Sequence, residues 1–201
     1  MTFSGSFEHS QVPESPTGMM IIEEREEKPV ATADDLISQL VSMGSYINQL
    51  YLQSHLIYLN IEGPLFLPVH EFLKGQYESH IEQFDTISEF IRSMDYLMPM
   101  CAKGLQSACK TFKHVKSYDA REMLTVYTKN LETAGFMAKD LGMVAKEVQA
   151  PDIENYLAEL VGVMFKAAWF LKATLRDQAW SQVLEARTNS PALKAPEGWI
   201  W

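Results

Sequence analysis

The sequence predicts an all-α protein, a bundle of four long helices, on two observations. Apolar residues recur at alternating three- and four-residue steps in four long segments, which is the period of a helix with one buried face. Proline-containing breaks separate these segments, and no stretch alternates apolar and polar residues as a strand does. We therefore expect one helical domain over residues 32–186, with an N-terminal tail at 1–31 and a C-terminal tail at 187–201.

The first predicted helix begins after Thr32 or Asp34, two residue types that cap helix N-termini. It ends near Asn60, because the dipeptide Gly63-Pro64 follows and cannot continue a helix. Its apolar stripe faces the core, and the expected buried positions are Leu36, Leu40, Met43, Ile47, Leu50 and Ser54.

The second predicted helix runs from about Phe66 to about Met94. Pro68 fits its first turn, where a missing N–H costs nothing. The segment Met98–Tyr118 follows and is polar and irregular, with a short helix predicted at Lys103–Lys110. Its length indicates a crossover connection that carries its own helix.

The third predicted helix is capped by Asp119 and extends to about Gln149, and Ala150-Pro151-Asp152 ends it and starts the next helix. The fourth predicted helix runs from Asp152 to about Glu185. The expected buried positions of these two helices are Met123, Val126, Leu131, Phe136, Leu141 and Val144, then Tyr156, Leu160, Val163, Ala167, Phe170 and Leu171.

The charge balance disfavours a nucleic-acid partner. The net charge is −9, which repels phosphates and attracts cations. The N-terminal tail has only Arg25 and Lys28 as basic residues, against six glutamates. We therefore predict no DNA binding through this tail.

The cellular compartment is predicted from the absence of other signals. No apolar run approaches the length of a membrane span, and the N-terminus lacks the pattern of a secretory leader. The two cysteines, Cys101 and Cys109, have no metal-like spacing and are expected to be inert packing residues in a reducing cytoplasm.

The second helix carries the candidate metal ligands. Asp85 and Glu89 are four residues apart, so both carboxylates project from one face. His70 lies fifteen residues before Asp85, which is roughly 22 Å along a helix. One ion cannot touch both ends within one subunit. The spacing leaves two alternatives: no shared metal site, or a site at a two-fold dimer interface.

Two motifs in this region resemble those of a known family. The run Asn60-Ile61-Glu62-Gly63-Pro64-Leu65-Phe66, followed by Val69-His70-Glu71, is similar to the Dps motif His-Trp-Asn-x-x-Gly-x-x-Phe-x-x-x-His. The run Asp85-Thr86-Ile87-Ser88-Glu89 is similar to the family's Asp-x-x-x-Glu. Weaker matches are Lys116-Ser117-Tyr118 and Lys166 with Trp169-Phe170-Leu171. The chain thus resembles the Dps miniferritins of the ferritin-like superfamily over about residues 33–177.

The resemblance implies a ferritin-like four-helix bundle with a short helix in the crossover between the second and third helices. It implies a cytoplasmic shell of twelve subunits built on two-fold dimers, with a ferroxidase site at each two-fold interface. Iron(II), or zinc in its place, binds there. Iron is oxidised, usually by hydrogen peroxide, and ferric iron is stored inside, which protects against oxidative stress.

The site residues carry over only in part. His70 matches a histidine ligand of the family, and Asp85 and Glu89 match the carboxylates given by the partner subunit. The family's first histidine is replaced by Tyr58, and an aspartate one turn after His70 is replaced by Lys74.

These replacements leave two alternatives for the activity. The chain is a working ferroxidase, or it is a Dps-like shell whose centre is altered or disabled. A neutral phenol is a poor iron(II) ligand. The Lys74 ammonium could take the metal's place and pair with the carboxylates across the interface. His55, three residues before Tyr58, could supply a substitute ligand.

Two further expectations concern other residues, and a third concerns the class of function. Asp152 and Glu154, at the start of the fourth helix, could line an acidic three-fold pore, as the family's habit suggests. His80 is expected at the surface, because it points well away from Asp85. An unrelated all-α interaction module is the third class of function, and the two motifs disfavour it.

Overall fold

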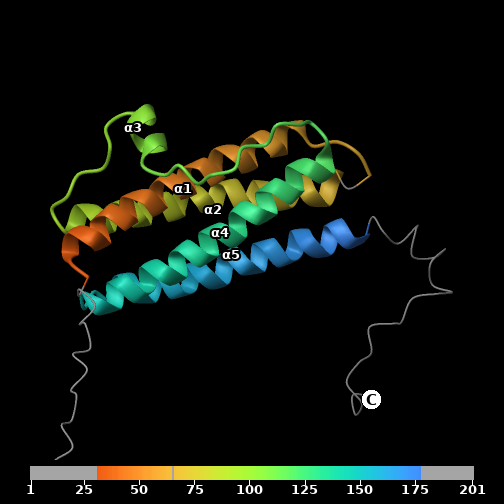
Figure 1. The fold of residues 1–201 in the computed structure, drawn as a ribbon. Helices are drawn as coiled ribbons and strands as arrows, with labels where there is room; N and C mark the ends of the chain where they lie inside the picture. Colours follow the sequence, from red (N-terminus) through yellow and green to blue (C-terminus); the bar gives the residue numbers. More distant parts are fainter. Residues whose placement is uncertain (1–30, 65, 178–201) are drawn as a thin grey trace, which may run out of the picture.

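A computed structural model describes residues 31–64 and 66–177. These residues form four long helices and one short helix in the crossover between the second and third long helices (Figure 1). The predicted all-α bundle is therefore confirmed. The helices are α1 (Ala33–Asn60), α2 (Phe66–Ser93), α3 (Ala102–Ser107), α4 (Ala120–Glu147) and α5 (Pro151–Asp177). The predicted C-terminal tail, most of the N-terminal tail and the last predicted turns of the fourth helix lie outside the described residues.

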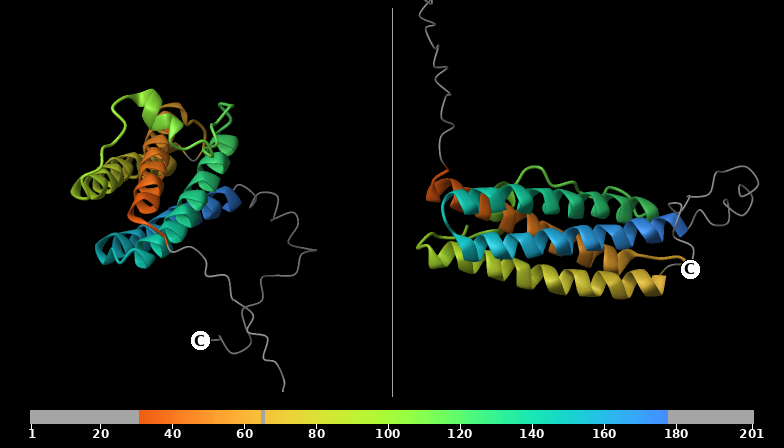
Figure 2. Two further views of the ribbon diagram at one scale, coloured as in Figure 1. Left: turned by 60° about the vertical axis from the view of Figure 1, so that its left-hand side comes forward. Right: turned by 90° about the horizontal axis from the view of Figure 1, so that it is seen from below.

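The bundle consists of two helical hairpins. α1 packs against α2, α4 packs against α5, and α1 also packs against α4 and joins the two pairs. The crossover runs along the outside of α1, with α3 seated on that helix (Figures 1 and 2). No helix in the described part of the chain has an apolar stretch that could span a bilayer.

The helix ends follow the capping residues. Thr32, not Asp34, caps α1: its Oγ1 accepts a hydrogen bond from the backbone N–H of Asp35, whose carboxylate accepts the N–H of Thr32 in return. Asp34 instead accepts the hydroxyl of Tyr96. Asp119 caps α4 as predicted, accepting from the N–H of Glu122 at 2.8 Å.

The buried face of α1 is the predicted one, since all six expected positions are buried. Three predictions on α4 and α5 are wrong, because Phe136, Val163 and Phe170 are exposed in the subunit. The buried stripes of these helices instead follow small residues that let the helices approach closely, so larger apolar residues flank the seam. Those stripes are Leu131, Ala134, Ala138 and Leu141 on α4, and Leu160, Met164, Ala167 and Leu171 on α5.

Buried amides fasten the crossover to α1. Gln53 donates to the carbonyl of Lys113 at 3.0 Å, and Gln49 donates to that of Cys109 at 3.4 Å. The hydroxyl of Ser45 donates to the carbonyl of Leu105 in α3. The Lys113 carbonyl also accepts from the side-chain amide of Asn130 on α4 at 2.7 Å, so side chains of two helices fix the path of the crossover. Both cysteines are free thiols.

Candidate metal centre

His70 has the geometry of a histidine prepared to bind a metal. It is partly buried on α2, and its Nδ1 lies 3.0 Å from the backbone oxygen of Tyr58. A carbonyl oxygen only accepts, so Nδ1 carries the proton and donates it to this bond. The lone pair is then on Nε2, the arrangement that metal-binding histidines use.

Tyr58 lies beside His70 and is part of an aromatic cluster. We define this aromatic cluster as His55 and Tyr58 on α1 with His70 and Tyr77 on α2. The rings of Tyr58 and His70 are stacked, with centroids 3.7 Å apart and planes inclined by 22°. The replaced position therefore packs against the remaining histidine and supplies no second imidazole.

His55 turns toward Tyr77 rather than toward His70. The centroids of His55 and Tyr77 are 4.5 Å apart, and those of Tyr58 and Tyr77 are 5.4 Å apart. The two tyrosines thus complete a path of ring contacts between the two histidines. In this conformation His55 and His70 share no contact among the described residues.

Lys74, Asp85 and Glu89 are all exposed on α2. At 100° per residue, Lys74 projects within about 20° of the direction of Asp85 and about 40° from that of His70. None of the three takes part in an ion pair among the described residues, where Lys172 with Glu132 forms the one salt bridge. The face therefore has a cationic end and an anionic end, and neither has an ion-pair partner among the residues that the structure describes.

The part of the subunit that the structure describes contains no complete metal site. Nowhere in residues 31–64 and 66–177 do three histidine, cysteine or carboxylate side chains converge. The fifteen-residue separation of His70 and Asp85 within continuous α2 makes this inevitable, since it corresponds to roughly 22 Å. Metal binding by these residues needs a second subunit.

Exposed apolar residues accompany the candidate ligands. Leu59 follows His55 by one helical turn, Ile81 follows Tyr77 by one turn, and Leu67 precedes His70 by three residues. All three are exposed. Apolar side chains mixed with aromatic rings and flanked by charges are typical of a surface that binds another protein.

His80 corrects a prediction. It is not at the surface: its side chain is 1% exposed in the core. Its Nδ1 lies 2.8 Å from Oε1 of Gln83, and its Nε2 lies 2.8 Å from the hydroxyl of Tyr127. Nδ1 donates and Nε2 accepts, so the ring is neutral, and burial lowers its pKa to about 4.

The signal for this burial was present in the sequence. His80 is seven residues from Leu73 and seven from Ile87, and both are fully buried. The surface prediction used only the angle between His80 and Asp85 around the helix, and that angle shows only that His80 points away from the carboxylate. It points inward, where Tyr127 and Gln83 satisfy it.

Asp152 and Glu154 occupy the first turn of α5. Glu154 lines a shallow groove between α4 and α5 together with Lys139 and Lys146. A pore would need several subunits around these carboxylates, so their pore role stays a prediction.

The comparisons with known proteins agree with the fold. The model of the ferritin-like domain family matches residues 22–179. Dps from Thermosynechococcus elongatus is 18% identical with a TM-score of 0.68, covering 71% of this chain and 90% of its own. Dps from Staphylococcus aureus is 15% identical with a TM-score of 0.68, covering 72% of this chain and 97% of its own.

A Dps protein from Vibrio cholerae O1, a member of a broad superfamily of ferritin-like diiron-carboxylate proteins, is 17% identical with a TM-score of 0.66. The match covers 74% of this chain and 98% of that one. No curated protein matches this chain in sequence. At these identities, the solved structures establish likeness of fold.

Proposed function

This chain belongs to the ferritin-like domain family, and on that premise we propose that it sequesters iron as a subunit of a hollow, Dps-like cytoplasmic shell. The observation that supports the proposal most is the orientation of His70. Its Nδ1 donates to the Tyr58 carbonyl and leaves Nε2 free for a metal. The carboxylates that would complete the site, Asp85 and Glu89, lie at the other end of the same helix.

A two-fold axis would bring the two half-sites together. Antiparallel pairing of two α2 helices that sets His70 opposite Glu89 of the partner subunit also sets Lys74 opposite Asp85 of the partner subunit. Tyr77 and Ile81 would then lie within about three residues of the axis. The exposed side chains of Leu59, Leu67 and Ile81 support a contact of this kind, because a monomer would leave them in water.

The donor set suits iron(II), with zinc as a substitute. One imidazole nitrogen and two carboxylates are ligands that both ions accept. In the proposed reaction, one hydrogen peroxide takes one electron from each of two iron(II) ions and becomes two water molecules with two protons. The ferric product would collect inside the shell, and removing iron(II) and peroxide together would protect the cell from oxidative damage.

Lys74 favours a second version of this function, in which the shell stores iron without fast ferroxidation. Its ammonium has no ion-pair partner within residues 31–64 and 66–177, and it projects close to the direction of Asp85. At the interface it would neutralise the carboxylates and compete with a divalent ion for them. Tyr58, stacked on His70, supplies no compensating imidazole.

Ferric absorbance after mixing iron(II) with peroxide separates the two versions. We expect the unmodified protein to oxidise iron(II) faster than buffer does. Lys74→Asp should raise the initial rate by about tenfold or more, because it exchanges a cation for a ligand. Lys129→Asp, on an exposed lysine of α4, is the matched control and should leave the rate unchanged.

Two outcomes would contradict the proposal at different levels. A rate equal to that of buffer would reject ferroxidase activity and leave the storage version. A stable monomer in solution, measured by light scattering, would reject the shell and with it any site shared between subunits.

A further inference from the structure

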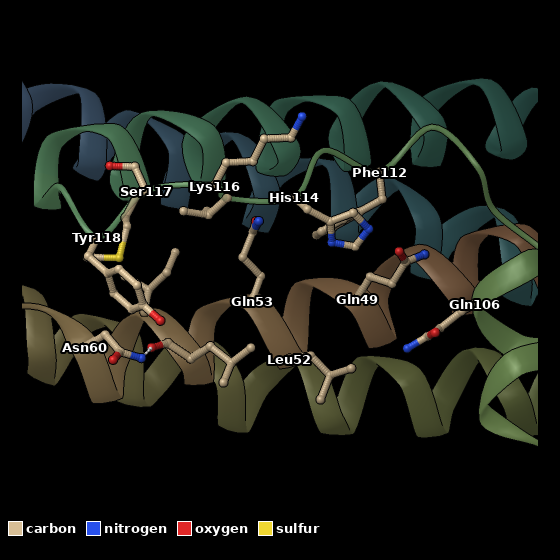
Figure 3. Close-up of a pocket in the computed structure, with 14 residues that line it drawn as sticks. Gln49, Leu52, Gln53, Asn60, Gln106, Phe112, His114, Lys116, Ser117 and Tyr118 are labelled. Atoms are coloured by element: carbon tan, nitrogen blue, oxygen red, sulfur yellow. Dashed lines mark hydrogen bonds between the residues drawn. The ribbon is translucent and has the colours of Figure 1, made fainter.

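A groove lies between α1 and the crossover, apart from the candidate metal centre. It has a volume of about 500 Å³ (Figure 3). Leu56, one of its lining residues, is 59% exposed, so the groove leaves a large apolar side chain in water. The apolar residues that line it are Leu52, Leu56 and Ile57 of α1, Phe112 and Val115 of the crossover, and Met123 of α4.

The charges around this groove are all positive. Lys116 is its charged lining residue, and no carboxylate lines it. The chain from Tyr96 to Tyr118 carries four lysines and no acidic residue, although the whole protein has a net charge of −9. All four lysines are exposed and none has an ion-pair partner among the described residues: Lys103, Lys110, Lys113 and Lys116.

A segment of this same chain has the complementary composition. Residues 19–22 read Met-Met-Ile-Ile, and residues 23–27 then carry four glutamates and one arginine. We propose that residues 19–27 dock on this surface of their own subunit. Residues 19–22 cover Leu52 and Leu56, and the glutamates lie over the lysines of the crossover.

The lengths agree with this order of contacts. Leu52 and Leu56 lie about 28 and 35 Å along α1 from its first residue, whereas Ser45, which holds α3, lies about 18 Å along it. An extended chain leaving Ala31 covers about 3.3 Å per residue, so it reaches roughly 13–26 Å at the glutamates and 30–40 Å at residues 19–22. The acidic residues thus reach the level of α3, and the apolar residues reach the leucines.

The docking combines two interactions that can be tested separately. The apolar part removes Leu52 and Leu56 from water, and salt should affect it little. The ionic part involves exposed charges, so salt should weaken it. The inference depends on neither the shell nor the metal, so it can fail or succeed independently of the proposed function.

Limited digestion of the full-length protein with trypsin tests the proposal. The bond after Arg25 is the tryptic site within the segment, since trypsin does not cleave Lys28 before Pro29. We expect slow cleavage at Arg25 in the unmodified protein. Leu56→Glu should accelerate it roughly tenfold, because cleavage follows the undocked population. Met143→Glu is the matched control, because Met143 is a large apolar side chain of α4 that is 55% exposed and does not line the groove, and it should leave the cleavage rate unchanged.

A second pair of variants tests the ionic part. Replacing Lys103 and Lys110 with glutamine should accelerate cleavage, and 0.5 M salt should do the same in the unmodified protein, while Lys129→Gln should have no effect. Equal cleavage rates in Leu56→Glu and Met143→Glu would overturn the proposal. So would a Leu56→Glu variant that loses assembly mass without faster cleavage, because a second copy would then cover the groove.

Discussion

Two histidines of α2, ten residues apart, have opposite environments. His70 is partly exposed at the outer face, and one ring nitrogen donates to a backbone carbonyl while the other is free. His80 is 1% exposed in the core, and side chains satisfy both of its ring nitrogens. Only a histidine with a free nitrogen can bind a metal, so residue type alone does not identify the ligand.

The two sites also differ in what they contribute. The neutral, fully hydrogen-bonded His80 is part of the core, and its contribution is to stability. His70 is partly exposed, and it shares its helix face with charged residues that have no ion-pair partner in the described part of the chain and with exposed apolar residues. Its expected contribution is to binding. The following predictions test this division, beginning with the largest effect.

Removing the imidazole of His80 should destabilise the bundle strongly. His80→Leu leaves the Tyr127 hydroxyl and the Gln83 side-chain oxygen buried without their partner. We expect the free energy of unfolding to fall by about 2–4 kcal/mol in urea titrations followed by circular dichroism. His70→Leu should cost less than about 1 kcal/mol. Equal losses in the two variants would contradict the division.

The stability should also depend on pH through His80. The folded state holds this ring neutral down to a pKa of about 4, whereas the unfolded chain takes up the proton below about pH 6.5. The unfolded state therefore binds more protons in this window, and stability falls as pH is lowered from 6.5 toward 4. The expected loss is about 3 kcal/mol.

Histidine variants show how much of this pH dependence of stability comes from His80 and how much from carboxylates. His80→Gln should flatten the dependence of the urea midpoint on pH between 6.5 and 4, and His70→Gln should leave it unchanged. A slope that persists in His80→Gln would assign the acid sensitivity to other groups.

Iron binding should depend on His70 and not on His80, the reverse of what is expected for stability. His70→Gln should weaken iron(II) binding about tenfold in anaerobic calorimetric titrations, because it removes the one oriented imidazole. His80→Gln, compared under conditions where both variants are folded, should bind iron as the unmodified protein does. The site assignment fails if His70→Gln binds iron normally.

His55 should have the smallest effect. Its ring stacks on Tyr77 and does not contact His70, so His55→Phe preserves the stacking and should change iron(II) affinity by less than about twofold. A loss as large as that of His70→Gln would instead make His55 the substitute ligand. The same titrations distinguish the two results.

Local sequence signals predicted the fold well. The cap at Asp119, the corner at Gly63-Pro64 and the apolar stripe of α1 each depend on neighbouring residues, and each prediction is confirmed. Predictions of which face is buried were less successful. Phe136, Val163 and Phe170 have the right spacing for a core. The helices instead pack closely through alanines, so the buried contact lies on a different side of each helix and these three residues stay exposed.

The sequence by itself determined the helices, their ends and the distance between His70 and Asp85, because helix geometry is local and fixes spacing along one axis. Only the tertiary structure decided that the Tyr58 carbonyl orients His70, that burial beside Tyr127 keeps His80 neutral, and that the crossover frames a cationic groove. These features depend on contacts between segments far apart in the chain, and periodicity carries no information on which side chains meet there.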